Sequence, residues 1–120
     1  MKQFDLPKIS SEIESFMAER DWDQFHSLKN LSMALTVEAS ELAEIFQWLT
    51  DSQSAGVMND PEMRQRVQDE IADIAVYLIR FSQKADIDLE SAIRSKMIEN
   101  ASKYPVNLVK GKAIKYTDLK

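Results

Sequence analysis

Two pairs of acidic residues, each spaced three apart, are the groups in this sequence best suited to chemistry. Glu38 pairs with Glu41, and Glu70 pairs with Asp73. Residues three apart share one face of a helix, so two such pairs on neighbouring helices would surround one point with four carboxylates. These groups repel one another unless a cation lies between them. Hard cations such as Mg²⁺ or Mn²⁺ prefer oxygen ligands and keep positions open for water or phosphate, so the spacing predicts a magnesium site for phosphate transfer.

Apolar residues around both pairs indicate that the acidic groups face the inside of a helical bundle. Glu38 and Glu70 each occupy a slot in a stripe with the three-and-four spacing of a buried helix face. The stripe around Glu38 consists of Leu28, Leu31, Leu35, Leu42, Ile45 and Leu49, and the stripe around Glu70 consists of Val67, Ile74, Tyr77 and Phe81. A shift of the helical phase by one position would instead place both carboxylates on the rim as ordinary surface charges. Glu44, three residues after Glu41, is expected to lie outside the metal shell or in solvent.

Prolines, glycines and capping residues predict four helices, at residues 8–20, 28–50, 61–84 and 89–103. Ser10 or Ser11 signals the first start, Asp60 followed by Pro61 the third, and Asp88 the fourth, which ends before Pro105. Residues 51–59 are predicted to be a loop, and the last 15 residues are predicted to be irregular. No strand-like alternation of useful length is present. We therefore predict an all-α four-helix bundle, with a helical domain at residues 1–104 and a tail at 105–120 that contributes to the site.

Composition excludes several classes of function. The chain has 120 residues, a net charge of −5 and no cysteine. Such acidity argues against binding to duplex nucleic acid, which normally requires a basic surface. The absence of cysteine excludes disulfides, a thiolate nucleophile and a cysteine-based zinc site. No apolar run is long enough to cross a membrane, so we expect a cytoplasmic protein that binds no membrane.

The order of motifs along nearly the whole chain resembles the MazG-like all-α nucleoside triphosphate pyrophosphohydrolases, and among them the small dCTP pyrophosphatase type. The resemblance is carried by KNL at residues 29–31, EASELAEIFQW at 38–48, EIADIAVY at 70–77, and then Lys96, Asn100, Lys103, Tyr104 and Pro105. It implies hydrolysis of a nucleoside triphosphate, of a dCTP-like or non-standard deoxynucleotide, to the monophosphate and pyrophosphate. It also implies that Mg²⁺ is held by Glu38, Glu41, Glu70 and Asp73.

The same resemblance assigns residues to the substrate. It implies that three aromatic side chains line a nucleobase pocket, namely Trp22, Trp48 and Tyr77. It also implies that Asn30 binds the base or sugar. Three residues on or after the fourth helix are implied to reach the substrate, namely Lys96, Asn100 and Tyr104. Core packing of Trp48 and Tyr77 is the alternative. Ile13 stands where the dCTP pyrophosphatase type has a histidine, which leaves base selectivity open. His26 is expected to cap or pack in its turn.

Two alternative functions are a dUTPase-like enzyme and a non-catalytic helical module that binds nucleotides or proteins. A di-iron site is disfavoured, because such sites use Glu-x-x-His pairs and the single histidine precedes the second helix. Three apolar residues outside the inner stripes, together with Leu49 at the end of one stripe, would form a large exposed patch on a monomer; the three are Phe46, Met63 and Ile79. We therefore expect a homodimer or a homotetramer built as a dimer of dimers.

Overall fold

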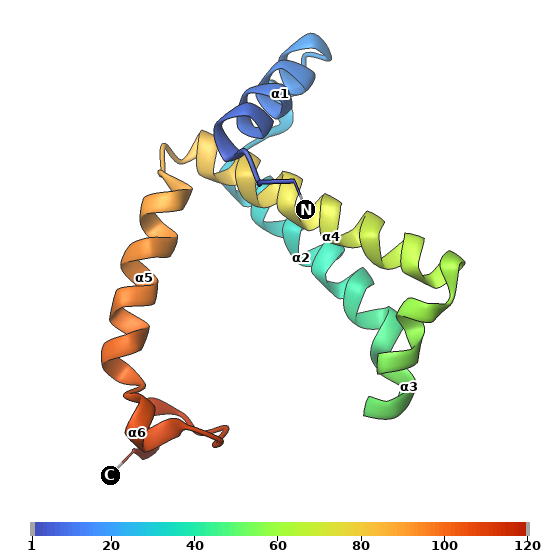
Figure 1. Cartoon of the computed structure of the whole chain (residues 1–120). Helices are drawn as coiled ribbons and strands as arrows, with labels where there is room; N and C mark the ends of the chain where they lie inside the picture. Colours follow the sequence, from blue (N-terminus) through green and yellow to red (C-terminus); the bar gives the residue numbers. More distant parts are fainter. Residues whose placement is uncertain (1, 120) are drawn as a thin grey trace. The chain divides into compact units, whose positions relative to one another are not determined.

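The computed structural model describes residues 2–119 and confirms the all-α class, since the described residues form α-helices and short 3₁₀ helices and no strand. The chain divides into two compact units, Met1–Asp86 and Ile87–Lys120 (Figure 1). Within the described residues every helix is too short or too polar to cross a lipid bilayer.

The first unit is built on two long helices that lie side by side. It contains, in chain order, α1 (Leu6–Glu19), η1 (Asp23–Phe25), α2 (Leu28–Phe46), α3 (Asp51–Gly56), η2 (Val57–Asn59) and α4 (Pro61–Lys84). The chain reverses through α3 and η2, so α2 and α4 are antiparallel, and they share the most extensive helix contact in the unit (Figure 1). Helix α1 also packs against α4.

Side-chain caps explain where these helices begin. Asp5 accepts a hydrogen bond from the Lys8 N–H at 3.0 Å, Ser27 from the Asn30 N–H at 3.0 Å, and Asp60 from the Glu62 N–H at 3.0 Å. Each cap satisfies a backbone donor that the first helical turn leaves unpaired. The cap at Asp5 starts α1 earlier than the predicted serines, whereas α4 has the predicted bounds 61–84.

The predicted loop at residues 51–59 is wrong, because these residues form α3 and η2. Thr50 accepts from the Gln53 N–H at 3.2 Å, and the Gln53 side chain accepts from the Thr50 N–H at 3.0 Å. This capping box satisfies two orphan donors at once and offsets the poor helix propensity of serine and glycine. The second helix also ends earlier than predicted, at Phe46 rather than Thr50.

The core of the first unit is small and is contributed by α1, α2 and α4. Its buried apolar residues are Ile13, Met17, Leu31, Ile45, Val67 and Ile79. The predicted inner stripe of α2 is therefore correct at its centre, but its terminal members Leu28 and Leu49 are exposed. Ile79, which we expected on an outer patch, is 4% exposed. Helix α1 packs on α4 in addition to α2, so α4 buries more than the single face that a pair of helices would cover.

The second unit contains α5 (Leu89–Lys103), α6 (Val106–Val109) and η3 (Tyr116–Asp118). Asp88 caps α5 by accepting from the Ser91 N–H at 2.9 Å, and α5 has the predicted bounds 89–103. The tail is less irregular than predicted, since it contains α6 and η3. The predicted domain boundary at residues 104 and 105 stays a prediction.

Candidate active site

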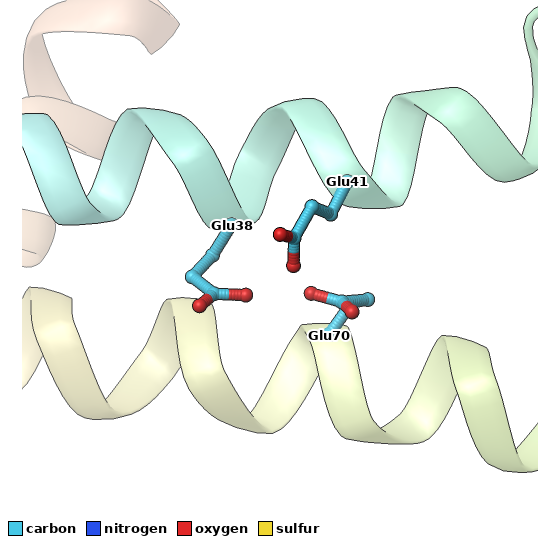
Figure 2. A group of neighbouring side chains, drawn as sticks. All are labelled: Glu38, Glu41 and Glu70. Atoms are coloured by element: carbon cyan, nitrogen blue, oxygen red, sulfur yellow. The ribbon is translucent and has the colours of Figure 1, made fainter.

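Three of the four predicted carboxylates converge between α2 and α4. Glu38 and Glu41 extend from successive turns of α2 toward Glu70 on α4 (Figure 2). One carboxylate oxygen from each lies within 4.8 Å of the others. All three side chains are half-buried. The spacing of three and the antiparallel contact of the two helices therefore produce the convergence that the sequence predicted.

This arrangement is electrostatically unfavourable for the protein alone. Glu38 Oε2 and Glu70 Oε2 are buried without a hydrogen-bond partner. The pKa of Glu38 is raised to about 7, first by the neighbouring Glu70 side chain, then by burial, and then by Glu41. Neighbouring carboxylates and desolvation both disfavour the charged form. The cluster is thus a place where positive charge would be strongly stabilising.

A hard divalent cation fits this set of donors. The unpartnered oxygens of Glu38 and Glu70 are the kind of ligand that Mg²⁺ and Mn²⁺ prefer, and a cation between them would remove both the repulsion and the unsatisfied acceptors. Asp73 is outside the converging group of three, and its side chain is exposed. Its charge nevertheless contributes to raising the pKa of Glu38, so it lies at the edge of the cluster.

A cavity of about 490 Å³ adjoins this edge and is lined by residues of α1 and α4 and by Trp22 and His26, which flank η1. Its aromatic walls come from Phe16, Trp22 and Tyr77, and Ile13 contributes aliphatic surface. The rings of Phe16 and Trp22 meet edge to face, with centroids 5.8 Å apart. Its charged or titratable lining groups, tyrosine aside, are Glu12, His26 and Asp73. The cavity is of a size and character that suit a flat, mostly apolar ring system with a few polar edges.

Asp73 connects the two halves of the site. It lines the cavity and also acts electrostatically on Glu38. A ligand with an aromatic ring in the cavity would therefore have its charged end beside the carboxylate cluster. A ring joined to a phosphate chain has this shape.

Comparison with protein families agrees with this geometry. The model of the MazG-like family matches residues 33–119, which include all four acidic residues. The chain belongs to the MazG-like family. The resemblance found in the sequence is thereby confirmed.

Mammalian relatives of this MazG-like chain are named dCTP pyrophosphatase 1. The chain is 43% identical over 115 residues to the proteins of that name from Rattus norvegicus and Mus musculus, and 40% identical to the one from Homo sapiens. Each alignment covers 96% of this chain and 66% of the relative, so the chain spans just under two thirds of their length. Among solved structures, a pyrophosphatase from Archaeoglobus fulgidus DSM 4304 is 30% identical, with a TM-score of 0.79 over 88% of this chain and 96% of that one.

Two predicted substrate residues of the first unit lie apart from the cavity in this MazG-like chain. Trp48 follows the end of α2 and is 86% exposed, so it is neither core nor cavity wall. The Asn30 amide donates to the backbone oxygen of Phe25 at 3.0 Å and thereby holds the turn that carries Trp22. The role of both in substrate binding stays a prediction, whereas Trp22 and Tyr77 do line the cavity.

The other predicted substrate residues belong to the second unit. Lys96 and Asn100 lie one turn apart on α5, and Tyr104 follows its end. Lys96 pairs with Glu99 at 3.2 Å, and Lys103 with the same carboxylate at 2.9 Å. The Lys103 bond is the largest cause of the lowered pKa of Glu99. The proposed contacts of these residues with substrate stay predictions.

Two contributors to the cavity region were not predicted from the sequence. Phe16 was not among the predicted substrate residues, although its aromatic ring forms part of the cavity wall. Arg80 is 2% exposed and bonds directly to His26, which lines the cavity. A signal for Arg80 was present, because it follows the inward Tyr77 by three residues and so lies on nearly the same side of the helix, where an unpaired charge is costly.

Proposed function

We propose that this MazG-like chain hydrolyses deoxynucleoside triphosphates of the dCTP type to the monophosphate and pyrophosphate. The observation that carries the proposal is the carboxylate cluster of Glu38, Glu41 and Glu70 beside an aromatic cavity, with Asp73 between them. The names of the mammalian relatives and of the archaeal pyrophosphatase support the same reaction class. In this reaction water breaks the bond between the α and β phosphates.

Glu38, Glu41 and Glu70 would hold the divalent cation, with Asp73 as the adjacent fourth carboxylate. A bound Mg²⁺ supplies charge neutralisation of phosphate oxygens and a more acidic bound water. The chain itself has a net charge of −5, and its cluster would repel a triphosphate on its own. Activity should therefore require the metal, and Mn²⁺ is expected to substitute.

The remaining roles follow from position. A carboxylate of the cluster that is not fully occupied by the cation orients the attacking water, and Glu38 and Glu41 are the candidates. The nucleobase stacks in the cavity against Trp22 and Tyr77, because flat aromatic surfaces stack favourably. This placement puts the phosphate chain beside Asp73. Lys96, Asn100 and Tyr104 are proposed to contact the substrate as the motif order implied, and Asn30 and Trp48 complete the proposed set.

The proposed assembly is a homodimer or homotetramer. Apolar side chains on the long helices of the first unit are exposed, among them Met33 at 57%, Val37 at 54% and Ile71 at 53%. On α5 of the second unit, Ile93, Met97 and Ile98 are also exposed. A monomer rarely leaves this much apolar surface in water, so copies of the chain are expected to cover it.

The decisive experiment incubates the purified protein with each common nucleoside and deoxynucleoside triphosphate plus Mg²⁺, and resolves the products by phosphorus NMR. Monophosphate and pyrophosphate should appear, with dCTP among the preferred substrates, and EDTA should abolish the reaction. Preference for dUTP would instead favour the dUTPase-like alternative. The absence of turnover with every nucleotide, together with nucleotide binding, would favour the non-catalytic module.

A further inference from the structure

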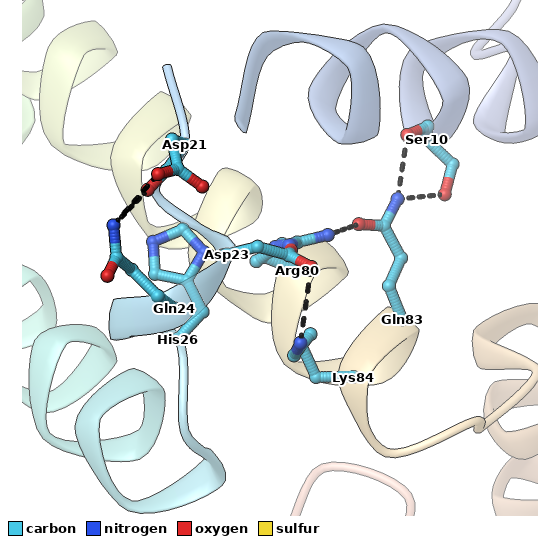
Figure 3. A network of polar contacts seen from close by, with 8 residues as sticks. All are labelled: Ser10, Asp21, Asp23, Gln24, His26, Arg80, Gln83 and Lys84. Atoms are coloured by element: carbon cyan, nitrogen blue, oxygen red, sulfur yellow. Dashed lines mark hydrogen bonds and ion pairs between the residues drawn. The ribbon is translucent and has the colours of Figure 1, made fainter. Parts of the chain in front are cut away.

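A buried arginine links the cavity to the interior of the first unit. Arg80 on α4 is 2% exposed, and a guanidinium at such depth is unfavourable unless its donors are paired. Arg80 Nε donates to His26 Nδ1 at 3.1 Å, and Nη1 donates to Gln83 Oε1 at 3.0 Å. Nη2 forms an ion pair with Asp23, whose other oxygen lies 3.7 Å from Lys84 Nζ (Figure 3).

The contact with Arg80 decides the state of the His26 ring. An arginine Nε always carries a hydrogen, so it can only donate, and His26 Nδ1 must therefore be an unprotonated acceptor. The single ring proton is then on Nε2. Because His26 also lines the cavity, the group that it retains for a ligand there is the Nε2–H donor. The pKa of His26 is lowered, first by burial and then by the charge of Lys84, in agreement with a neutral ring.

Arg80 also holds the turn that carries Trp22. Asp23 and His26 both belong to this turn, and the His26 N–H donates to the Asp23 oxygen at 3.1 Å. The Trp22 N–H donates to the Met17 oxygen at 3.1 Å, which joins the turn to the end of α1. From α4, Arg80 therefore bonds to two side chains of the turn, Asp23 and His26. The same turn carries Trp22, which lines the cavity.

We propose that Arg80 is a positioning residue for base recognition and that it acts through His26, whose Nε2–H donates to a carbonyl oxygen or ring nitrogen of the bound nucleobase. This inference rests on the function proposed above. The two carboxylates that line the cavity, Glu12 and Asp73, accept hydrogen bonds when ionised, so the fixed imidazole supplies a complementary donor. A pyrimidine offers such acceptors on its ring edge. The preferred ligand is therefore a nucleotide whose base presents an acceptor to His26.

Two variants and a matched control test the proposal. His26→Asn keeps an acceptor oxygen for Arg80 but lacks the Nε2–H, whereas Arg80→Lys keeps the buried charge but cannot donate to His26, Gln83 and Asp23 together. Ile79→Val alters the adjacent buried residue of α4 and controls for a loss of stability alone. Each protein is assayed with dCTP and with the abasic deoxyribose triphosphate, which has no base.

The expected result is a base-dependent change in KM. His26→Asn and Arg80→Lys should raise KM for dCTP by about tenfold, the effect of one lost hydrogen bond, with little change in kcat. Both should leave KM for the abasic triphosphate unchanged, and Ile79→Val should leave both values unchanged. Equal effects on the two substrates, or none, would overturn the proposal. If Arg80→Lys does not fold, His26→Asn decides the question.

A second readout is independent of turnover. His26 is the only histidine, so the nitrogen NMR signals of its ring are unambiguous. The wild-type ring should show a protonated Nε2 and an unprotonated Nδ1, and titration with a non-hydrolysable dCTP analogue should shift the Nε2–H signal. The inference would be refuted, even in an active enzyme, by a ring protonated at Nδ1 or by an Nε2–H signal that does not shift when the nucleotide analogue is added. Binding with the expected shift but without hydrolysis would sustain it while refuting the proposed reaction.

Discussion

Glu38 is the residue on which the electrostatics of the site concentrate. It is half-buried, one of its oxygens has no partner, and it faces Glu41 and Glu70 from the same cluster. The pKa of Glu38 is raised to about 7 by these neighbours and by burial. Without a cation, ionisation of this carboxyl group destabilises the folded protein. A bound cation would stabilise its deprotonated form, which is the form that binds metal.

Removal of one carboxylate should separate folding from activity. Glu41→Gln should lower kcat by about 100-fold or more, since even indirect partners of a metal commonly have effects of up to that size. Helical content by circular dichroism should not change, because the neutral amide has nearly the same shape. The matched control is Glu44→Gln, an exposed position on the same helix, which should keep wild-type turnover. Normal turnover in Glu41→Gln would refute the site.

The stability of the metal-free protein should depend on pH in an unusual direction. Between the ordinary value of 4.5 and about 7, folded Glu38 keeps a proton that the unfolded chain has lost. The folded state then binds more protons than the unfolded state, so its stability falls as pH rises through this window. Because the lowered pKa of His26 acts in the opposite direction, the test is the difference between variants: in EDTA, Tm from pH 5 to pH 8 should change more unfavourably in the wild type than in Glu38→Gln, and Mg²⁺ should raise Tm most at the high end. A Tm that rises with pH in EDTA and is indifferent to Glu38→Gln would contradict this account.

The antiparallel pair of α2 and α4 is the element that turns two short motifs into a site. Each helix is begun by a local cap, and the contact between them brings residues 38 and 70 together. The connection depends on α3, which the sequence analysis predicted as a loop. The capping box of α3 is formed by neighbouring residues. Its two reciprocal hydrogen bonds stabilise the helix enough to offset the low helix propensity of the nearby serine and glycine residues.

A variant of this cap tests the element. Thr50→Ala should lower the free energy of unfolding by about 1 kcal/mol, because the Gln53 N–H loses its acceptor. KM should not change, since Thr50 lies outside the cavity lining. Ser52→Ala, at an exposed position in the same short helix, is the control and should cost less. Chemical denaturation of the three proteins measures the difference, and an equal effect of both variants would mean that the cap is not what stabilises α3.

At the scale of the whole molecule, acidity and exposed apolar surface have separate consequences. The net charge of −5 would repel the proposed triphosphate substrate, so a bound cation would favour its approach. The small core of the first unit and the exposed apolar side chains of its long helices favour association. A small domain buries a smaller fraction of its surface than a large one, so association with copies of itself would add buried surface.

The proposed assembly can be tested by measuring the mass of the protein in solution and by introducing one charged residue on its exposed apolar surface. Light scattering should give a mass at least twice the 13.8 kDa of the chain. Val37→Lys should shift the population toward monomer, because it places a charge on an exposed apolar face of α2. Gln68→Lys, which adds the same charge at an exposed polar position of α4, is the control. A wild-type protein that scatters only as 13.8 kDa would remove the assembly.

The sequence by itself determined the bounds of α4 and α5 and the face of each helix on which the acidic pairs lie, because both depend on short-range spacing. These bounds and the inward position of Glu38 and Glu70 follow from helical periodicity and local caps. Only the tertiary structure decided how residues far apart in the chain meet. It placed Arg80 against His26, 54 positions away, and Gln83 against Ser10. No periodicity predicts such pairs, since they arise from the angle and register at which α1 and its following turn pack on α4.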